Sequence, residues 1–253
     1  MNNLSQHIYR FFHPLVIGIH PEFQSQKAFI ESIPERVKNN EGIVIYKGRN
    51  EIRKIKYEGQ SYVIKSFCRP HWINKFIYGI FRGSKAKRSF LYANRFIEIG
   101  VGSPQPVAYI DERNGLLFGR SYYVSLLSEC PYTYAALFEQ EFDYADEVLR
   151  TIGRMTAILH NHGYAHKDYG RGNILFGRKA DGTVLVEIVD LNRLHIGIID
   201  LKQGCKNLER LPATPHMHRL IAEEYAKLRG FDTETCYELI KAYRKAELGN
   251  EIY

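Results

Sequence analysis

The sequence predicts an α+β fold in two lobes, and three observations lead to this prediction. Residues 42–127 contain short apolar runs with strand-like alternation, separated by turns and interrupted by one helical segment. Residues 144–246 are dominated by segments whose apolar residues recur at helical spacing. Between these parts, Ser128–Pro131 has the composition of a hinge. A run of strands followed by a run of helices is typical of an α+β architecture.

The first lobe is expected to begin with an antiparallel meander. Residues 1–40 are weakly patterned, and we interpret Pro14, Pro21 and Pro34 as breakers. Strands are then predicted over 42–46, 52–57 and 61–67. They are joined by short turns at Gly48-Arg49-Asn50 and Glu58-Gly59-Gln60.

A helix and three further strands complete the predicted first lobe. The helix runs from an N-cap at Ser84 to Ile99, and its stripe consists of Phe90, Ala93, Phe96 and Ile97. The strands are Pro106–Ile110, Leu116–Phe118 and Ser121–Leu127, around an Asn114-Gly115 turn. We therefore predict that residues 1–129 form an N-terminal extension and N-lobe, and that residues 130–253 form the C-lobe.

The second lobe contains the strongest helical signal. Over residues 144–161 an apolar stripe is formed by Val148, Ile152, Met155 and Leu159. A hairpin follows, built from Ile174–Phe176 and Val184–Val189 around Asp181-Gly182. Two helices, Met217–Leu228 and Thr233–Ala246, are predicted to close the chain.

Composition excludes several classes of protein. With 45% apolar and 25% charged residues, the 253-residue chain has the make-up of a globular protein. The four cysteines lie far apart and form no CxxC pair, which fits neither a disulfide framework nor a zinc site and indicates a reducing cytosol. The apolar stretch Leu15–Ile19 is too short for a secretion signal, and no run approaches the roughly 20 residues of a spanning helix.

Positive charge is concentrated in the first lobe. Residues 47–96 carry 13 Lys/Arg against two acids, and residues 69–95 carry seven Lys/Arg and no acid. Aromatic residues are interleaved in the same segment, namely Trp72, Phe76, Tyr78 and Phe81. Such a pattern suits an anionic membrane surface or a nucleic acid, while a solvated helix face with a buried apolar stripe is the simpler alternative.

A cluster of polar residues in the second lobe points to chemistry. Asp168 follows His166 by two residues, Asn173 comes five residues later, and Asp190 ends an apolar strand. Phosphoryl transfer from ATP needs a carboxylate that orients and deprotonates the attacking hydroxyl, together with oxygen ligands for Mg²⁺. We therefore predict Asp168 as the catalytic base and Asn173 and Asp190 as metal ligands. His166 is expected to brace the loop through hydrogen bonds.

The nucleotide grip is expected in the first lobe. Lys65 lies at the end of Tyr62-Val63-Ile64-Lys65 on the third strand of the meander, as a lysine that reaches ATP phosphates would. The turn Gly48-Arg49-Asn50 has a single glycine, but its backbone N–H groups suit a phosphate-covering loop. A metal cluster formed by His160, His162 and His166 is disfavoured, because their spacing matches no zinc motif and no Cys or carboxylate completes a set.

These motifs together resemble the lipopolysaccharide core kinases, the Kdo and heptose kinase group of the protein-kinase-like superfamily. The resemblance covers roughly residues 43–245 and is carried by Tyr62–Lys65, the helix from Ser84, Pro104-Gln-Pro106, His166–Leu175 and Val189–Arg193. It implies a two-lobed protein-kinase-like fold with an antiparallel-sheet N-lobe and a mainly helical C-lobe. It also implies that ATP and Mg²⁺ are used to phosphorylate an inner-core sugar hydroxyl.

The resemblance implies partners as well. A lipid-linked core glycan is expected as acceptor, and the 69–95 segment is expected to meet the anionic inner membrane from the cytoplasmic side. We expect no nucleic-acid partner and a monomeric chain. Two alternatives stay open: a nucleotide-binding scaffold without activity, because the 84–97 helix lacks the Glu that usually pairs with the strand lysine, and an aminoglycoside- or choline-type phosphotransferase.

Overall fold

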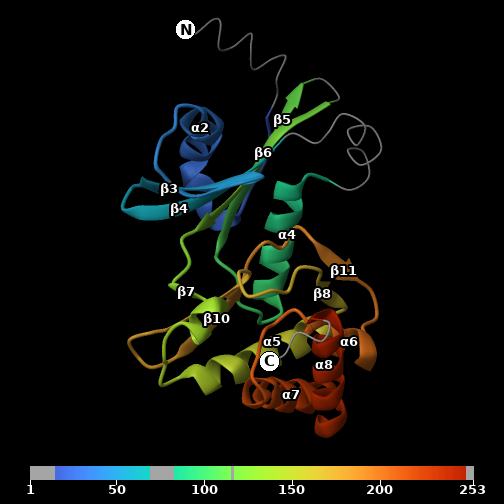
Figure 1. Ribbon diagram of the computed structural model, residues 1–253. Coiled ribbons are helices and arrows are strands. Elements are labelled where there is room, and N and C mark those ends of the chain that lie inside the picture. Colours follow the sequence, from blue (N-terminus) through green and yellow to red (C-terminus); the bar gives the residue numbers. More distant parts are fainter. Residues whose placement is uncertain (1–14, 69–82, 115–116, 249–253) are drawn as a thin grey trace, which may run out of the picture. The chain divides into compact units, whose positions relative to one another are not determined.

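The computed structural model describes residues 15–68, 83–114 and 117–248, and its chain divides into two compact units (Figure 1). The N-terminal unit comprises Met1–Asn94 and Gln105–Leu127, and the C-terminal unit comprises Arg95–Pro104 and Ser128–Tyr253. The third and last passage between the units, from Leu127 to Ser128, falls at the start of the segment that we expected to be a hinge. No described helix combines the length and the apolar character needed to cross a bilayer.

The N-terminal unit is built on a six-stranded antiparallel sheet with the order β1-β5-β6-β4-β3-β2. Its strands are β1 (Leu15–Ile19), β2 (Ile43–Lys47), β3 (Asn50–Tyr57), β4 (Gln60–Phe67), β5 (Pro106–Asn114) and β6 (Leu117–Leu126). The meander β2-β3-β4 is confirmed. The prediction of separate strands at 116–118 and 121–127 is wrong, because one continuous strand, β6, pairs with both β5 and β4. Part of the predicted Asn114-Gly115 turn lies outside the described residues.

One face of this sheet is covered by the short 3₁₀ helix η1 (Pro21–Gln26) and the helix α2 (Lys27–Lys38), which the sequence analysis missed. Pro34 lies inside α2 and does not end it. The buried face of α2 consists of Phe29, Ile30, Ile33 and Val37, which join the core of the sheet. Burying a large apolar side chain contributes about 1.5–3 kcal/mol, so four of them outweigh the roughly 3 kcal/mol that a helix-interior proline costs.

Helix α4 (Lys85–Glu98) starts in the N-terminal unit and ends in the C-terminal unit. The predicted cap is confirmed, since the backbone N–H of Lys87 donates to Ser84 Oγ at 2.9 Å. The buried stripe differs in part from the predicted one. Ala93 and Phe96 are buried as expected, whereas Ile97 is 41% exposed and Ala86 and Ser89 take up the remaining buried positions.

The C-terminal unit is mainly helical. Its helices are η2 (Tyr134–Phe138), α5 (Ala145–Asn161), α6 (Leu201–Asn207), α7 (Pro215–Arg229) and α8 (Thr233–Leu248). A three-stranded sheet has the order β10-β9-β7, and a two-stranded sheet pairs β11 with β8. The strands are β7 (Tyr132–Thr133), β8 (Tyr164–His166), β9 (Ile174–Arg178), β10 (Val184–Ile188) and β11 (Leu194–Ile196). The predicted stripe of α5 is buried throughout, and only α6, β7, β8, β11 and η2 were not anticipated.

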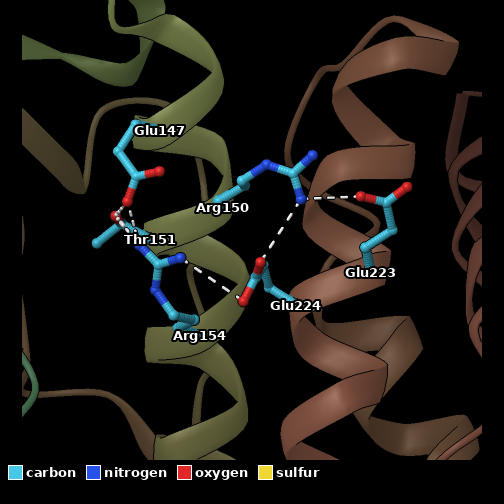
Figure 2. A network of polar contacts seen from close by, with 6 residues as sticks. All are labelled: Glu147, Arg150, Thr151, Arg154, Glu223 and Glu224. Atoms are coloured by element: carbon cyan, nitrogen blue, oxygen red, sulfur yellow. Dashed lines mark hydrogen bonds and ion pairs between the residues drawn. The ribbon is translucent and has the colours of Figure 1, made fainter.

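Helices α5 and α7 pack closely, and this contact fixes the helix that leads into the polar cluster. A Cβ atom on Gly153 would lie only 2.5 Å from the carbonyl oxygen of Ile221, so the helices approach at a position where only glycine fits. Figure 2 shows the charged network beside this contact, with Glu224 between Arg150 and Arg154. The Arg150 guanidinium lies 2.8 Å from Glu223 and 3.5 Å from Glu224, and Arg154 lies 3.6 Å from Glu224.

Candidate active site

The loop between β8 and β9 contains the predicted catalytic residues and is held by its own backbone. The carbonyl oxygen of Asp168 accepts from the N–H of Gly170 at 2.9 Å and from Asn173 Nδ2 at 2.8 Å. The N–H of Asn173 donates in turn to the Gly170 carbonyl at 2.9 Å. These bonds close a compact loop from which the half-exposed Asp168 carboxylate projects.

Tyr169 ties this loop to helix α5. The side chain is 1% exposed, and its hydroxyl lies 2.8 Å from Thr156 Oγ1. Thr156 Oγ1 donates to the Ile152 carbonyl at 2.7 Å, so the Tyr169 hydroxyl is the donor to Thr156. The residue that follows Asp168 is therefore buried in the core of the C-terminal unit and hydrogen-bonded to helix α5.

His166 joins the loop to the segment that carries Asp190. Its Nδ1 accepts from the backbone N–H of Asp168 at 3.1 Å, and its Nε2 faces the Asp190 carbonyl at 3.2 Å. A backbone N–H only donates and a carbonyl only accepts, so the proton of the neutral ring is on Nε2. Burial lowers the pKa of His166 below its ordinary value. Both ring nitrogens are thus committed to holding two backbone positions.

Asn173 is oriented in a way that suits a metal ligand. Its Nδ2 must face the Asp168 carbonyl, because that oxygen accepts and does not donate. The Oδ1 atom therefore points away from this bond, and within the described residues no group donates to it. An amide oxygen held in this way is a suitable ligand for Mg²⁺.

Asp190 lies next to Asn173 through the backbone. The N–H of Val189 donates to the Asn173 carbonyl at 2.9 Å, which places the start of the Asp190 segment beside the loop. Asp190 itself has a left-handed backbone with φ of 62°, and Asn192 Nδ2 donates to its Oδ1. This conformation turns the chain between β10 and β11. The backbone bond from Val189 therefore brings the residue before Asp190 beside Asn173.

The donor set fits magnesium bound together with phosphate. Mg²⁺ takes six oxygen ligands and is held by one or two protein groups plus substrate phosphates and water. Asp190 and Asn173 supply such groups. Among the residues that the structure describes, no three His, Cys, Asp or Glu side chains gather into a cage of their own.

A buried polar chain behind the loop was not predicted. Asn207, at the end of α6, donates from Nδ2 to the His166 carbonyl at 2.8 Å, and its Oδ1 lies 3.1 Å from His160 Nε2. The other nitrogen of His160 lies 2.9 Å from the Tyr225 hydroxyl on α7. His160 is 2% exposed, and burial lowers its pKa to about 4. A chain of hydrogen bonds thus runs from α7 through α5 and α6 to the His166 carbonyl, next to the loop that carries Asp168.

Arg210 is a second residue that the sequence analysis missed. Its Nη1 donates to the Lys167 carbonyl at 3.2 Å and lies 3.5 Å from Asp168 Oδ1. No local motif marks either Asn207 or Arg210, because both come from about 40 residues further along the chain and reach the loop only through the tertiary fold. Neither could have been found by spacing.

The predicted phosphate-binding residues lie in the N-terminal unit. Lys65 is on β4, where it pairs in register with Tyr123 of β6, and its Nζ lies 5.5 Å from the centroid of the Phe67 ring. Lys85 Nζ of α4 lies 6.0 Å from the same centroid. Gly48 and Arg49 form the turn between β2 and β3, and Asn50 is the first residue of β3. The Arg49 carbonyl accepts from the thiol of Cys68 at 2.9 Å.

Three further features of the chain are placed as follows. Glu98, the acid of α4, lies 3.1 Å from Arg95 on its own helix, and both side chains are largely exposed. His162 Nδ1 faces the Ile158 carbonyl at 2.9 Å. Most of the basic segment 69–95, including Arg69, Trp72 and Lys75, lies outside the described residues.

Comparison with known proteins agrees with this architecture. The structure of WaaP in complex with acyl carrier protein matches 91% of this chain and 98% of its own chain, with a TM-score of 0.62 and 16% identity. The Rio2 kinase–ADP/Mg²⁺–phosphoaspartate complex from Chaetomium thermophilum matches 87% of this chain and 70% of its own, with a TM-score of 0.47 and 12% identity. The chain has a protein-kinase-like fold, with an antiparallel-sheet N-lobe and a mainly helical C-lobe.

A comparison of sequences finds a relative with a named activity. The chain is 33% identical over 131 residues to the 3-deoxy-D-manno-octulosonic acid kinase of Vibrio cholerae serotype O1. The match covers 51% of this chain and 52% of the relative, so it spans about half the length of the curated protein. No protein-family model matches the chain. The relative is named as a kinase of a sugar acid, and the WaaP structure shows the same fold.

Proposed function

We propose that the chain is a kinase that transfers the γ-phosphoryl group of ATP to a sugar hydroxyl of the lipopolysaccharide inner core, on Kdo or heptose. The observation that carries the proposal is the loop geometry, in which His166 holds the backbone of Asp168 and Asp190 while Asn173 presents its amide oxygen. The relative that matches about half of this chain is named as a 3-deoxy-D-manno-octulosonic acid kinase, and this supports the proposed class of acceptor.

Each residue has a role in this proposal. The Asp168 carboxylate orients the acceptor hydroxyl and accepts its proton. Asp190 and Asn173 would hold Mg²⁺, which would neutralise phosphate charge when bound. Lys65 and the turn Gly48-Arg49-Asn50 would bind the phosphates of ATP. His166 keeps the loop in shape without exchanging a proton, because both of its nitrogens are engaged.

The proposal is tested by transfer from ATP to an acceptor. The purified protein is incubated with ATP, Mg²⁺ and a lipid A precursor that carries Kdo, and the product mass is measured. A gain of one phosphate is expected, and Asp168→Asn, which keeps the size of the side chain, is expected to abolish it. Phosphorylation of choline or an aminoglycoside but of no core glycan would favour the small-molecule phosphotransferase instead.

A nucleotide-binding scaffold is the second candidate, and α4 provides the observation in its favour. Glu98 is the only acid in Lys85–Glu98, and it is paired with Arg95 on the same helix. A scaffold would bind ATP and Mg²⁺ but transfer phosphate to none of the acceptors. Nucleotide binding is measured in the same samples as transfer. A scaffold would bind the nucleotide without transferring phosphate, whereas an unfolded protein would do neither.

We further propose that the protein associates peripherally with the cytoplasmic face of the inner membrane through residues 69–95. Lys85, Lys87 and Arg88 are half-buried, and Lys87 lies over the Tyr109 ring at 5.8 Å, so replacing them would disturb the N-terminal unit itself. The test therefore reverses the charges of Arg69, Lys75 and Arg82. Reduced co-sedimentation with phosphatidylglycerol vesicles is expected, with Lys202→Glu as control. Unchanged binding would contradict the proposal.

A further inference from the structure

The guanidinium of Arg210 has an unused edge beside the proposed base. Its Nη1 makes both of the contacts described above, to the Lys167 carbonyl and to Asp168 Oδ1. Within the described part of the chain, Nε and Nη2 have no partner. These two nitrogens form the planar fork that binds a carboxylate through two parallel hydrogen bonds. Arg210 is anchored by one nitrogen and presents the other two.

The contact with Asp168 does not satisfy this charge. The two side chains are 47% and 48% exposed and lie 3.5 Å apart without a hydrogen bond. Such exposed pairs contribute little to stability. A ligand anion could therefore take up the free edge of Arg210 at little cost, while the bond to the Lys167 carbonyl keeps the guanidinium in place.

The surroundings of Asp168 are cationic. Lys167, Arg171 and Arg193 are exposed, and the N–H of Lys167 donates to the Arg193 carbonyl at 3.0 Å, which joins the two segments. Positive charge of this kind attracts the phosphates of ATP, and it would equally attract an acceptor that carries negative charge of its own.

We infer that Arg210 is an acceptor-specificity residue that binds a carboxylate on the sugar to be phosphorylated. The inference rests on the proposed function and narrows it. Of the two proposed acceptors, Kdo carries a carboxylate and heptose does not. A carboxylate on the Nε/Nη2 edge of Arg210 would bring hydroxyls of the same sugar to Asp168, so recognition and chemistry would share one loop.

The test compares two acceptors that differ only in charge. The methyl glycoside of Kdo and its carboxamide carry the same hydroxyl groups. For the wild type, kcat/KM for the acid is expected to exceed that for the carboxamide by about 10- to 150-fold, the equivalent of a charged hydrogen-bonded pair. Arg210→Gln is expected to raise the KM for the acid until this ratio approaches one. Arg210→Lys, which keeps the charge without the fork, should be intermediate, and Lys202→Gln is the matched control.

The outcomes separate the inference from the proposed function. Equal use of acid and carboxamide by the wild type would overturn the inference and leave the kinase intact. An equal loss of kcat on both acceptors in Arg210→Gln would overturn it too, because Arg210 would then act on the loop or the phosphoryl group. If no acceptor is phosphorylated, the proposed function fails. The inference about Arg210 is then tested by calorimetry, which measures the binding of the two glycosides to the protein. Arg210-dependent preference for the acid supports the inference, and equal binding refutes it.

Discussion

Acid should destabilise this protein through His160, because the ring is buried as a neutral group. The pKa of His160 is lowered to about 4 by burial, against an ordinary value near 6.5. The unfolded chain therefore binds a proton more readily than the folded one. The stability that the neutral ring contributes is complete above the unfolded pKa and is lost as the pH falls from about 6.5 towards 4.

The size of the effect follows from the two pKa values. Linkage between protonation and folding gives a loss of about 2 kcal/mol by pH 5 and about 3 kcal/mol by pH 4, relative to neutral pH. His166 and His218 also have lowered pKa values caused first by burial, so the whole protein should lose more than this. A variant at His160 is needed to isolate its share.

The comparison is between the wild type and His160→Gln, which is polar at the same site but does not titrate. Urea unfolding at neutral pH and near pH 5 gives the free energy of unfolding for each. The wild type should lose about 2 kcal/mol more than the variant over this interval, since other groups titrate alike in both. Parallel losses would refute the argument. If the variant does not fold, NMR titration of the His160 ring in the wild type decides, and protonation near pH 6.5 would be the contrary result.

Three further predictions concern the loop and its support. Asp168→Ala should lower phosphoryl transfer by a factor on the order of 10² or more with an unchanged circular dichroism spectrum, and near-normal turnover would remove it as base. Asp190→Asn should weaken binding of ATP with Mg²⁺ more than binding of ATP alone, because it removes the charge that faces the cation; equal losses in calorimetry would contradict this. Gly153→Ala should destabilise the protein by about 1–3 kcal/mol in urea unfolding, against the gain of about 1 kcal/mol usual for this change in a helix, because its Cβ would meet the Ile221 carbonyl.

The sequence predicted those parts of the fold that have strong local signals. The meander, the Ser84 cap and the α5 stripe follow from periodicity and turn residues, and the structure has them. Helix α2 is not predicted because Pro34 is a typical helix breaker, although the four buried apolar residues of α2 lie at helical spacing. Helix α6 has seven residues, too few for a periodic signal.

Only those residues of the site that belong to one local sequence motif could be predicted. Asp168 and Asn173 share one loop, so their spacing is sufficient to place them together. Asn207 and Arg210 approach that loop through the packing of α6, and nothing local distinguishes them from other polar residues. The pairing of His160 with Tyr225 likewise depends on the α5–α7 contact, which pattern alone does not determine.

The left-handed backbone of Asp190 has a consequence for how this chain can change by mutation. At a φ of 62° the residues that fit most easily are Gly, Asn and Asp, and of these only Asp carries charge. Single-base substitutions convert an Asp codon into Asn or Gly codons. Either change would remove the proposed charged ligand and leave the turn intact. Glu would keep the charge but strain the turn. The substitutions to Asn and Gly at this position are therefore expected to give a folded protein without the proposed acidic ligand, rather than an unfolded one.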